Sequence, residues 1–129
     1  MTTILIADDD DNVRYALSKL LRKAGYDVLE ARNGKEACKL LIKAMPDVLV
    51  TDIVMPEQDG MGLFNMAREL NPSIPVLVVS GGGNVVGLDY LSLAQTMGAN
   101  ATLCKPFDND EFLSVVANLV VVAKRQQQR

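Results

Sequence analysis

The chain has 129 residues, of which 49% are hydrophobic and 22% charged, so it can form one ordinary domain with its own apolar core. Its formal net charge of −3 argues against nucleic acid as a partner, because such a surface needs clustered Lys and Arg. No histidine is present, which excludes zinc sites and His-based catalysis, and no apolar run approaches the ~20 residues of a membrane helix.

Short apolar segments alternate along the chain with longer amphipathic ones. Three of the short segments are continuously apolar, which is typical of strands buried on both faces of a sheet. Two weaker segments complete a set of five. The predicted strands cover residues 4–7, 26–31, 47–51, 76–79 and 101–104.

Five helices are predicted between and after these strands, each from apolar residues at helical spacing. Asp10 or Asp11 can cap the first helix, and Gly25 ends it. The fifth helix is expected from about Asp110 to Ala123, and residues 124–129 are expected to form a short, frayed polar tail after a domain of residues 1–123. The apolar stripes are Val13, Ala16, Leu17, Leu20, Leu21 and Ala24, then Ala37, Leu40, Leu41 and Ala44, then Leu63, Phe64, Ala67 and Leu70, then Leu88, Leu91, Ala94 and Met97, and lastly Phe112, Val115, Val116, Leu119 and Ala123.

Strict alternation of strands and helices predicts an α/β fold with a parallel sheet and helices on both faces. The economical arrangement is a flavodoxin-like (βα)5 three-layer sandwich, with five parallel strands in the order 2-1-3-4-5. Cys38 and Cys104 have neither metal-ligand nor disulfide-framework spacing and are interpreted as small core residues.

Polar side chains follow the strands that this order makes neighbours. Aspartates at 8–11 follow the first strand, Asp52 the third, Ser80 the fourth and Lys105 the fifth. Ligands of such sheets bind at the carboxyl ends of the strands, so these groups are predicted to converge at one edge.

A cluster of carboxylates at one edge requires a compensating charge. Two carboxylates ~4 Å apart repel by about 4 kcal/mol at an effective dielectric constant near 20. All-oxygen ligands predict Mg²⁺, with Mn²⁺ as a substitute. A carboxylate nucleophile, a metal, the Lys105 amine and the Ser80 hydroxyl are the components that phosphoryl transfer uses.

Four segments together resemble the response-regulator receiver family of two-component signalling. They are residues 4–9 (ILIADD), 51–56 (TDIVMP) with 59–60 (DG), 75–81 (PVLVVSG) and 105–107 (KPF). They occur in the family's order and spacing, and the resemblance covers residues 3–123. It implies that Asp52 is the phosphoacceptor, and that Asp9, Asp52 and the backbone carbonyl of Val54 bind Mg²⁺ directly, with Asp8 acting mainly through metal-bound water.

The resemblance also implies roles for the last two strands. Ser80 would follow the phosphoryl group, and Lys105 would pair with Asp52 and then with the phosphate. The Lys105–Pro106 peptide is expected to be cis. Thr102 departs from the pattern, because many members have Tyr or Phe there, so an aromatic switch is not expected.

The implied function is signalling rather than enzymatic turnover. The phosphoryl donor would be a phosphohistidine on a kinase or phosphotransfer protein, and the output would be binding of a downstream protein. We expect a stand-alone cytoplasmic domain, because no basic segment precedes the apolar N-terminal run and no effector follows residue 129. The excess of apolar residues at 113 and 120–122 indicates either deeper burial or a partner or homodimer surface on the fourth helix, fifth strand and fifth helix.

Two other functions stay open on the sequence. A haloacid-dehalogenase-type phosphatase would use the Asp8-x-Asp10 pattern with Ser80 and Lys105, but it would leave Asp52 idle and lacks a late pair of aspartates. A pseudo-receiver that only binds partners would not need the carboxylates, Ser80 and Lys105 together.

Overall fold

The computed structural model describes residues 2–52, 60–81 and 98–127, in which there are five strands and four helices. The predicted helix containing Leu88 and Met97 lies outside these residues. The elements are β1 (Thr3–Ala7), α1 (Asp11–Lys23), β2 (Asp27–Ala31), α2 (Gly34–Ala44), β3 (Val48–Asp52), α3 (Gly60–Leu70), β4 (Val76–Gly81), β5 (Ala101–Lys105) and α5 (Asn109–Gln127).

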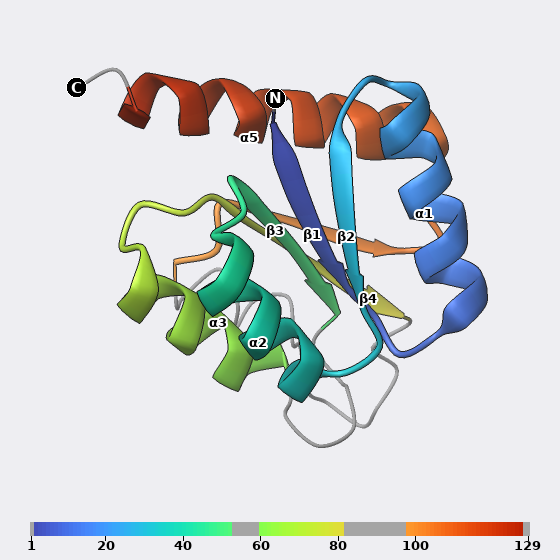
Figure 1. The fold of residues 1–129 in the computed structure, drawn as a ribbon. Helices are drawn as coiled ribbons and strands as arrows, with labels where there is room; N and C mark the ends of the chain where they lie inside the picture. The colour runs from blue at the N-terminus through green and yellow to red at the C-terminus, as the bar shows by residue number, and fades with distance from the viewer. Residues whose placement is uncertain (1, 53–59, 82–97, 128–129) are drawn as a thin grey trace.

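The strands form one parallel sheet in the order β2-β1-β3-β4-β5, which confirms the predicted topology (Figure 1). The register aligns Ala7 of β1 with Thr51 of β3, and Gly81 of β4 with Lys105 of β5. Because all strands run in the same direction, the residues that follow β1, β3 and β5 emerge at one edge of the sheet.

The sheet is covered on both faces, which explains its continuously apolar strands. In β1, Leu5 and Ala7 pack in the core beneath α2 and α3, whereas Ile4 and Ile6 pack in the core beneath α1 and α5 (Figure 1). Successive side chains of a strand point to opposite faces, so a strand buried on both sides needs apolar residues at every position. These two packed layers hold the strand ends in fixed positions.

The first helix begins where its sequence provides a cap. The Asp10 side chain accepts hydrogen bonds from the backbone N–H groups of Asn12 and Val13 at 2.9 and 3.2 Å. Asp10 is therefore the N-cap, and Asp11 is the first helical residue. At the other end, Gly25 adopts a φ of 98°, a left-handed conformation that glycine accepts without steric cost.

Helix α5 is longer than expected. It continues to Gln127, so residues 124–127 are helical where fraying was expected. Of the surplus apolar residues, Val120 is buried and Val121 is 47% exposed, so deeper burial accounts for only part of the surplus. Among the described helices, none combines the length and the apolar character that a bilayer crossing requires.

One cysteine differs from its expected environment. Cys38 lies partly buried against the core on the α2 and α3 face, but Cys104 is exposed. Cys104 lies on β5, which is an edge strand of the sheet with one neighbour only. The interpretation of Cys104 as a core residue was therefore wrong.

Candidate functional site

Acidic and basic side chains meet at the carboxyl edge of the sheet. Asp8 directly follows β1, Asp52 ends β3 and Lys105 ends β5. The Lys105 Nζ donates hydrogen bonds to Oδ2 of Asp8 at 2.7 Å and to Oδ2 of Asp52 at 3.1 Å. The three side chains are 1% (Asp8), 13% (Asp52) and 16% (Lys105) exposed. One ammonium thus bridges two carboxylates in a nearly buried setting, where charge interactions are stronger than in water.

The Lys105 amine is held in its charged form. Burial alone would lower its pKa, but the hydrogen bond to Asp8 and the charges of Asp52 and Asp8 outweigh burial and raise the pKa above its ordinary value. The amine is therefore a cation at neutral pH. It is placed to hold negative oxygen atoms near Asp52.

Asp8 is fixed by contacts on all its polar groups. Its backbone N–H donates to the Ala31 carbonyl at 3.1 Å, and its carbonyl accepts from Arg14 at 2.8 Å. Its Oδ1 accepts from the Asp10 backbone N–H at 2.9 Å, while Oδ2 accepts from Lys105. The turn between β1 and α1 therefore presents its carboxylates in a defined arrangement.

A group of three carboxylates is suited to a hard divalent cation. One oxygen from each of Asp8, Asp9 and Asp52 can be chosen so that all lie within 4.8 Å of one another. The set contains only oxygen donors, and Asp9 is exposed, so metal-bound water can be accommodated. This chemistry fits Mg²⁺ or Mn²⁺. Asp10, whose role the sequence left open, caps α1 instead.

The other predicted site residues are placed less completely. Ser80 lies on β4 opposite Cys104 of β5, but the position of its hydroxyl is outside the described part of the structure. Val54 lies outside the described residues altogether. The Lys105–Pro106 peptide is cis, as expected. Thr102 lies half-buried on β5, opposite Val78 of β4.

Arg14 is a site neighbour that the sequence did not reveal. It lies on the first turn of α1, is only 9% exposed, and donates to the Asp8 carbonyl. Its spacing of six residues from Asp8 gives a faint signal, because it places an arginine on the helix that leaves the acidic turn. The pattern alone does not show which way the side chain turns.

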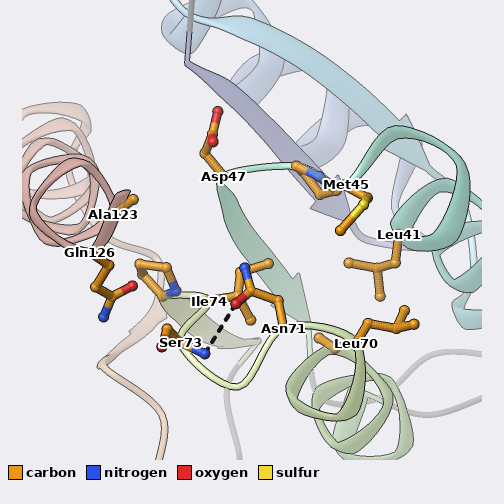
Figure 2. A pocket seen from close by; sticks show the side chains of 12 residues that line it. Leu41, Met45, Asp47, Leu70, Asn71, Ser73, Ile74, Ala123 and Gln126 are labelled. Atoms are coloured by element: carbon orange, nitrogen blue, oxygen red, sulfur yellow. Dashed lines mark hydrogen bonds between the residues drawn. The ribbon is translucent and has the colours of Figure 1, made fainter. Parts of the chain in front are cut away.

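A separate hollow lies at the opposite, amino edge of the sheet. It has a volume of about 380 Å³ and is bordered by the ends of α2, α3 and α5 and the starts of β3 and β4. Figure 2 shows Met45 and Leu41 from one side of it and Ala123 and Gln126 from the other. Among its lining residues, Asp47 alone has an ionisable side chain, so this hollow lacks the converging charges of the carboxyl edge.

Comparison with known proteins identifies the family to which this fold belongs. A family model described as the response regulator receiver domain matches residues 4–117. The chain belongs to this family. The match runs from β1 into the first half of α5, and therefore includes every strand that contributes to the carboxyl edge.

Curated relatives of this receiver domain differ in length. The chain is 34% identical over 125 residues to the DNA-binding transcriptional regulator NtrC of Escherichia coli, covering 97% of the chain and 26% of that protein. It thus spans about a quarter of the NtrC-type relatives. Shorter relatives include the sporulation initiation phosphotransferase F of Bacillus subtilis, at 31% identity with 88% of the chain and 89% of the relative covered. The receiver protein CpdR of Brucella abortus is 32% identical, with 95% and 100% covered.

Solved structures show the same architecture. A receiver domain protein from Clostridium thermocellum superimposes with a TM-score of 0.86 at 25% identity, covering 99% of this chain and 98% of the other. A response regulator from Chloroflexus aurantiacus gives a TM-score of 0.84 at 35% identity, covering 93% and 98%. The phosphatase alternative is not favoured, because the family is the receiver family and Asp52, which that alternative left idle, is bonded to Lys105.

Proposed function

We propose that this receiver domain accepts a phosphoryl group on Asp52 from a phosphohistidine donor. In the transfer, a carboxylate oxygen of Asp52 forms a bond to phosphorus, and the bond from phosphorus to the donor imidazole nitrogen breaks. The imidazole leaves with the electron pair of that bond and takes up a proton. The product is an aspartyl phosphate. The observation that supports this proposal is the bridge from Lys105 to Asp52 at 3.1 Å and to Asp8 at 2.7 Å.

Lys105 would act by charge and position. Its Nζ already lies within hydrogen-bond distance of the proposed acceptor carboxylate, so it can donate to a phosphoryl oxygen without a large rearrangement. Preorganised donors of this kind stabilise the negative charge that develops on transferred groups. The Ser80 hydroxyl, at the end of the neighbouring strand, would donate to another phosphoryl oxygen.

Asp8, Asp9 and Asp52 would hold a Mg²⁺ ion, with Mn²⁺ as a substitute, and the backbone carbonyl of Val54 would complete the protein ligands. The ion supplies positive charge that offsets the carboxylates and the incoming phosphoryl oxygens. Asp8 is bonded to Lys105 through one oxygen and to the Asp10 N–H through the other. This arrangement supports a role for Asp8 through metal-bound water, while the exposed Asp9 would bind the ion directly.

The output would be a change of binding surface rather than a released product. The donor would be a histidine kinase or a phosphotransfer protein, and the recipient a downstream protein. The net charge of −3 supports a protein recipient rather than nucleic acid. On α5, Val121 is 47% exposed, which supports a homodimer or partner surface that includes α5 and β5.

The test compares Asp52, the last residue of β3, with Asp47, which precedes the strand. Wild-type protein, Asp52→Asn and Asp47→Asn are incubated with acetyl phosphate and Mg²⁺ and analysed by intact mass. We expect one phosphate adduct on the wild type and on Asp47→Asn, and none on Asp52→Asn. Phosphoramidate, which carries the phosphorus–nitrogen bond of a phosphohistidine, should give the same pattern. An adduct on Asp52→Asn, or none on the wild type, would disprove the proposal.

A further inference from the structure

Arg14 forms a clamp beneath the acidic turn. Its Nη1 donates to the backbone carbonyl of Asp8 at 2.8 Å, and its Nη2 donates to the Asp11 carboxylate. Its Nε lies 3.4 Å from Oε1 of Glu30 on β2. The planar guanidinium therefore connects the end of β1, the start of α1 and the neighbouring strand β2.

The bond to the Asp8 carbonyl fixes more than Asp8. That carbonyl belongs to the peptide that joins Asp8 to Asp9, and a peptide is planar. Holding its oxygen therefore sets the direction in which the backbone enters Asp9. Among the described residues, none donates a hydrogen bond to the Asp9 carboxylate. Within this part of the chain, the backbone alone directs Asp9 towards the other two carboxylates.

The charge of Arg14 does not explain its position. Two carboxylates, those of Asp11 and Glu30, already face the guanidinium. Glu30 is shared with Arg22, whose Nη2 lies 3.3 Å from its Oε2. Arg14 is thus neutralised by its own surroundings, and its remaining contribution at the carboxyl edge is the direction of the Asp8–Asp9 peptide.

We infer that Arg14 is a positioning residue for divalent cation binding, holding the Asp8–Asp9 peptide so that the Asp9 carboxylate joins those of Asp8 and Asp52. The inference rests on the proposed function, which places Mg²⁺ among these three carboxylates. It assigns Arg14 a role through geometry, with no contact to the ion or to the phosphoryl group.

The test measures the dissociation constant of Mg²⁺ by calorimetry on the unphosphorylated protein. Arg14→Met should raise this constant about tenfold or more, the usual effect of losing a residue that orients a metal ligand. Arg14→Lys keeps the charge but lacks the planar fork, so it should not restore binding. Arg22→Met is the matched control, because Arg22 lies on the same helix as Arg14 and also pairs with Glu30, but does not bond to Asp8. It should change the constant by less than about twofold.

Thermal unfolding without metal separates positioning from stability. Arg22→Met and Arg14→Lys should both remain folded at the assay temperature. If Arg14→Met does not fold, Arg14→Lys carries the test, since it must still weaken binding. The inference is overturned if either Arg14 variant binds Mg²⁺ with the wild-type dissociation constant. It is also overturned if Arg22→Met weakens Mg²⁺ binding as much as the Arg14 variants do. A wild-type protein that does not bind Mg²⁺ overturns the proposed function as well, so the two failures are distinguishable.

Discussion

The two ends of β3 carry aspartates in contrasting surroundings. Asp47 precedes the strand at the amino edge, and its Oδ2 accepts a hydrogen bond from the Thr3 backbone N–H at 2.8 Å. Asp52 ends the strand at the carboxyl edge, where it meets Lys105 and the carboxylates of Asp8 and Asp9. The same residue type thus supports the start of β1 at one end and a charged cluster at the other.

The direction of the strands produces this difference. In a parallel sheet every strand leaves by the same edge, so the residues after β1, β3 and β5 are brought together from distant parts of the sequence. Helix N-termini also face that edge, which favours anionic groups there. At the amino edge, the strands begin and the helices end. There the carboxylate of Asp47 accepts a hydrogen bond from the Thr3 backbone N–H.

Among the residues that the structure describes, the hollow lined by Met45 and Ile74 lies at the edge of the sheet opposite the cluster of Asp8, Asp52 and Lys105. The hollow of about 380 Å³ is at the amino edge, where Met45, Leu70 and Ile74 contribute apolar surface (Figure 2). The converging charges of Asp8, Asp52 and Lys105 lie at the carboxyl edge.

Lys105→Met should have the largest effect at the carboxyl edge. Methionine keeps an unbranched apolar stem but removes the ammonium that bridges Asp8 and Asp52. We expect the rate of phosphorylation by acetyl phosphate to fall about 100-fold, as on loss of a preorganised donor. The affinity for Mg²⁺ should rise roughly tenfold, because a competing cation has left the cluster. Stopped-flow or quenched mass measurements give the rate, and calorimetry gives the affinity.

The matched control for this change is Lys124→Met. Lys124 lies exposed on α5, beside the amino edge. Its loss should alter neither quantity by more than about twofold. If both lysine variants slow phosphorylation equally, the effect is one of overall charge, and the contrast between the two edges does not hold. Weaker Mg²⁺ binding by Lys105→Met would equally contradict the expected arrangement.

The pH dependence of stability should reveal the raised pKa of Lys105. Burial lowers the pKa of Lys105, but the interactions with Asp8 and Asp52 outweigh burial and raise this pKa above its ordinary value of 10.5. A raised pKa in the folded state means that the charged amine contributes stability below pH 10.5 and loses it as pH rises through the folded value. In metal-free protein, the stability difference between wild type and Lys105→Met should therefore be flat through neutral pH and shrink only above that value. Denaturant titrations at a series of pH values measure it, and a difference that shrinks near neutral pH would contradict the shift.

The sequence predicted the carboxyl edge because that edge depends on chain order. Asp8, Asp52 and Lys105 each follow a recognisable strand, and the strand order brings those strands together. Details that depend on side-chain direction were not predictable in this way. Arg14 turns inward to the Asp8 carbonyl, and Cys104 on the edge strand β5 is exposed. Neither direction follows from apolar periodicity.

Helix ends were the other weak point of prediction. The sequence allowed either Asp10 or Asp11 to cap α1, and the hydrogen bonds to Asn12 and Val13 identify Asp10. Helix α5 passes its expected end because Lys, Arg and Gln are good helix formers, so residues 124–127 continue it without further apolar contacts. Helix α2 ends at Ala44, and the sequence did not show how the chain turns after it.

That turn provides the smallest predicted effect, at the amino edge. Met45 caps the end of α2 with a φ of 47°, a left-handed conformation that costs a residue with a side chain roughly 1–2 kcal/mol. Met45 is 66% exposed, so its side chain gives little burial in return. Met45→Gly removes the steric cost but adds freedom to the unfolded chain, so we expect unfolding to require about 0.5–1 kcal/mol more free energy. Ala44→Gly, one residue earlier and still helical, should instead lose about 0.5–1 kcal/mol. Because both positions lie far from Asp52 in the fold, phosphorylation should be unchanged in each variant. Denaturant unfolding of the two variants measures the contrast directly. Equal destabilisation by both glycines would show that the Met45 backbone carries no conformational cost.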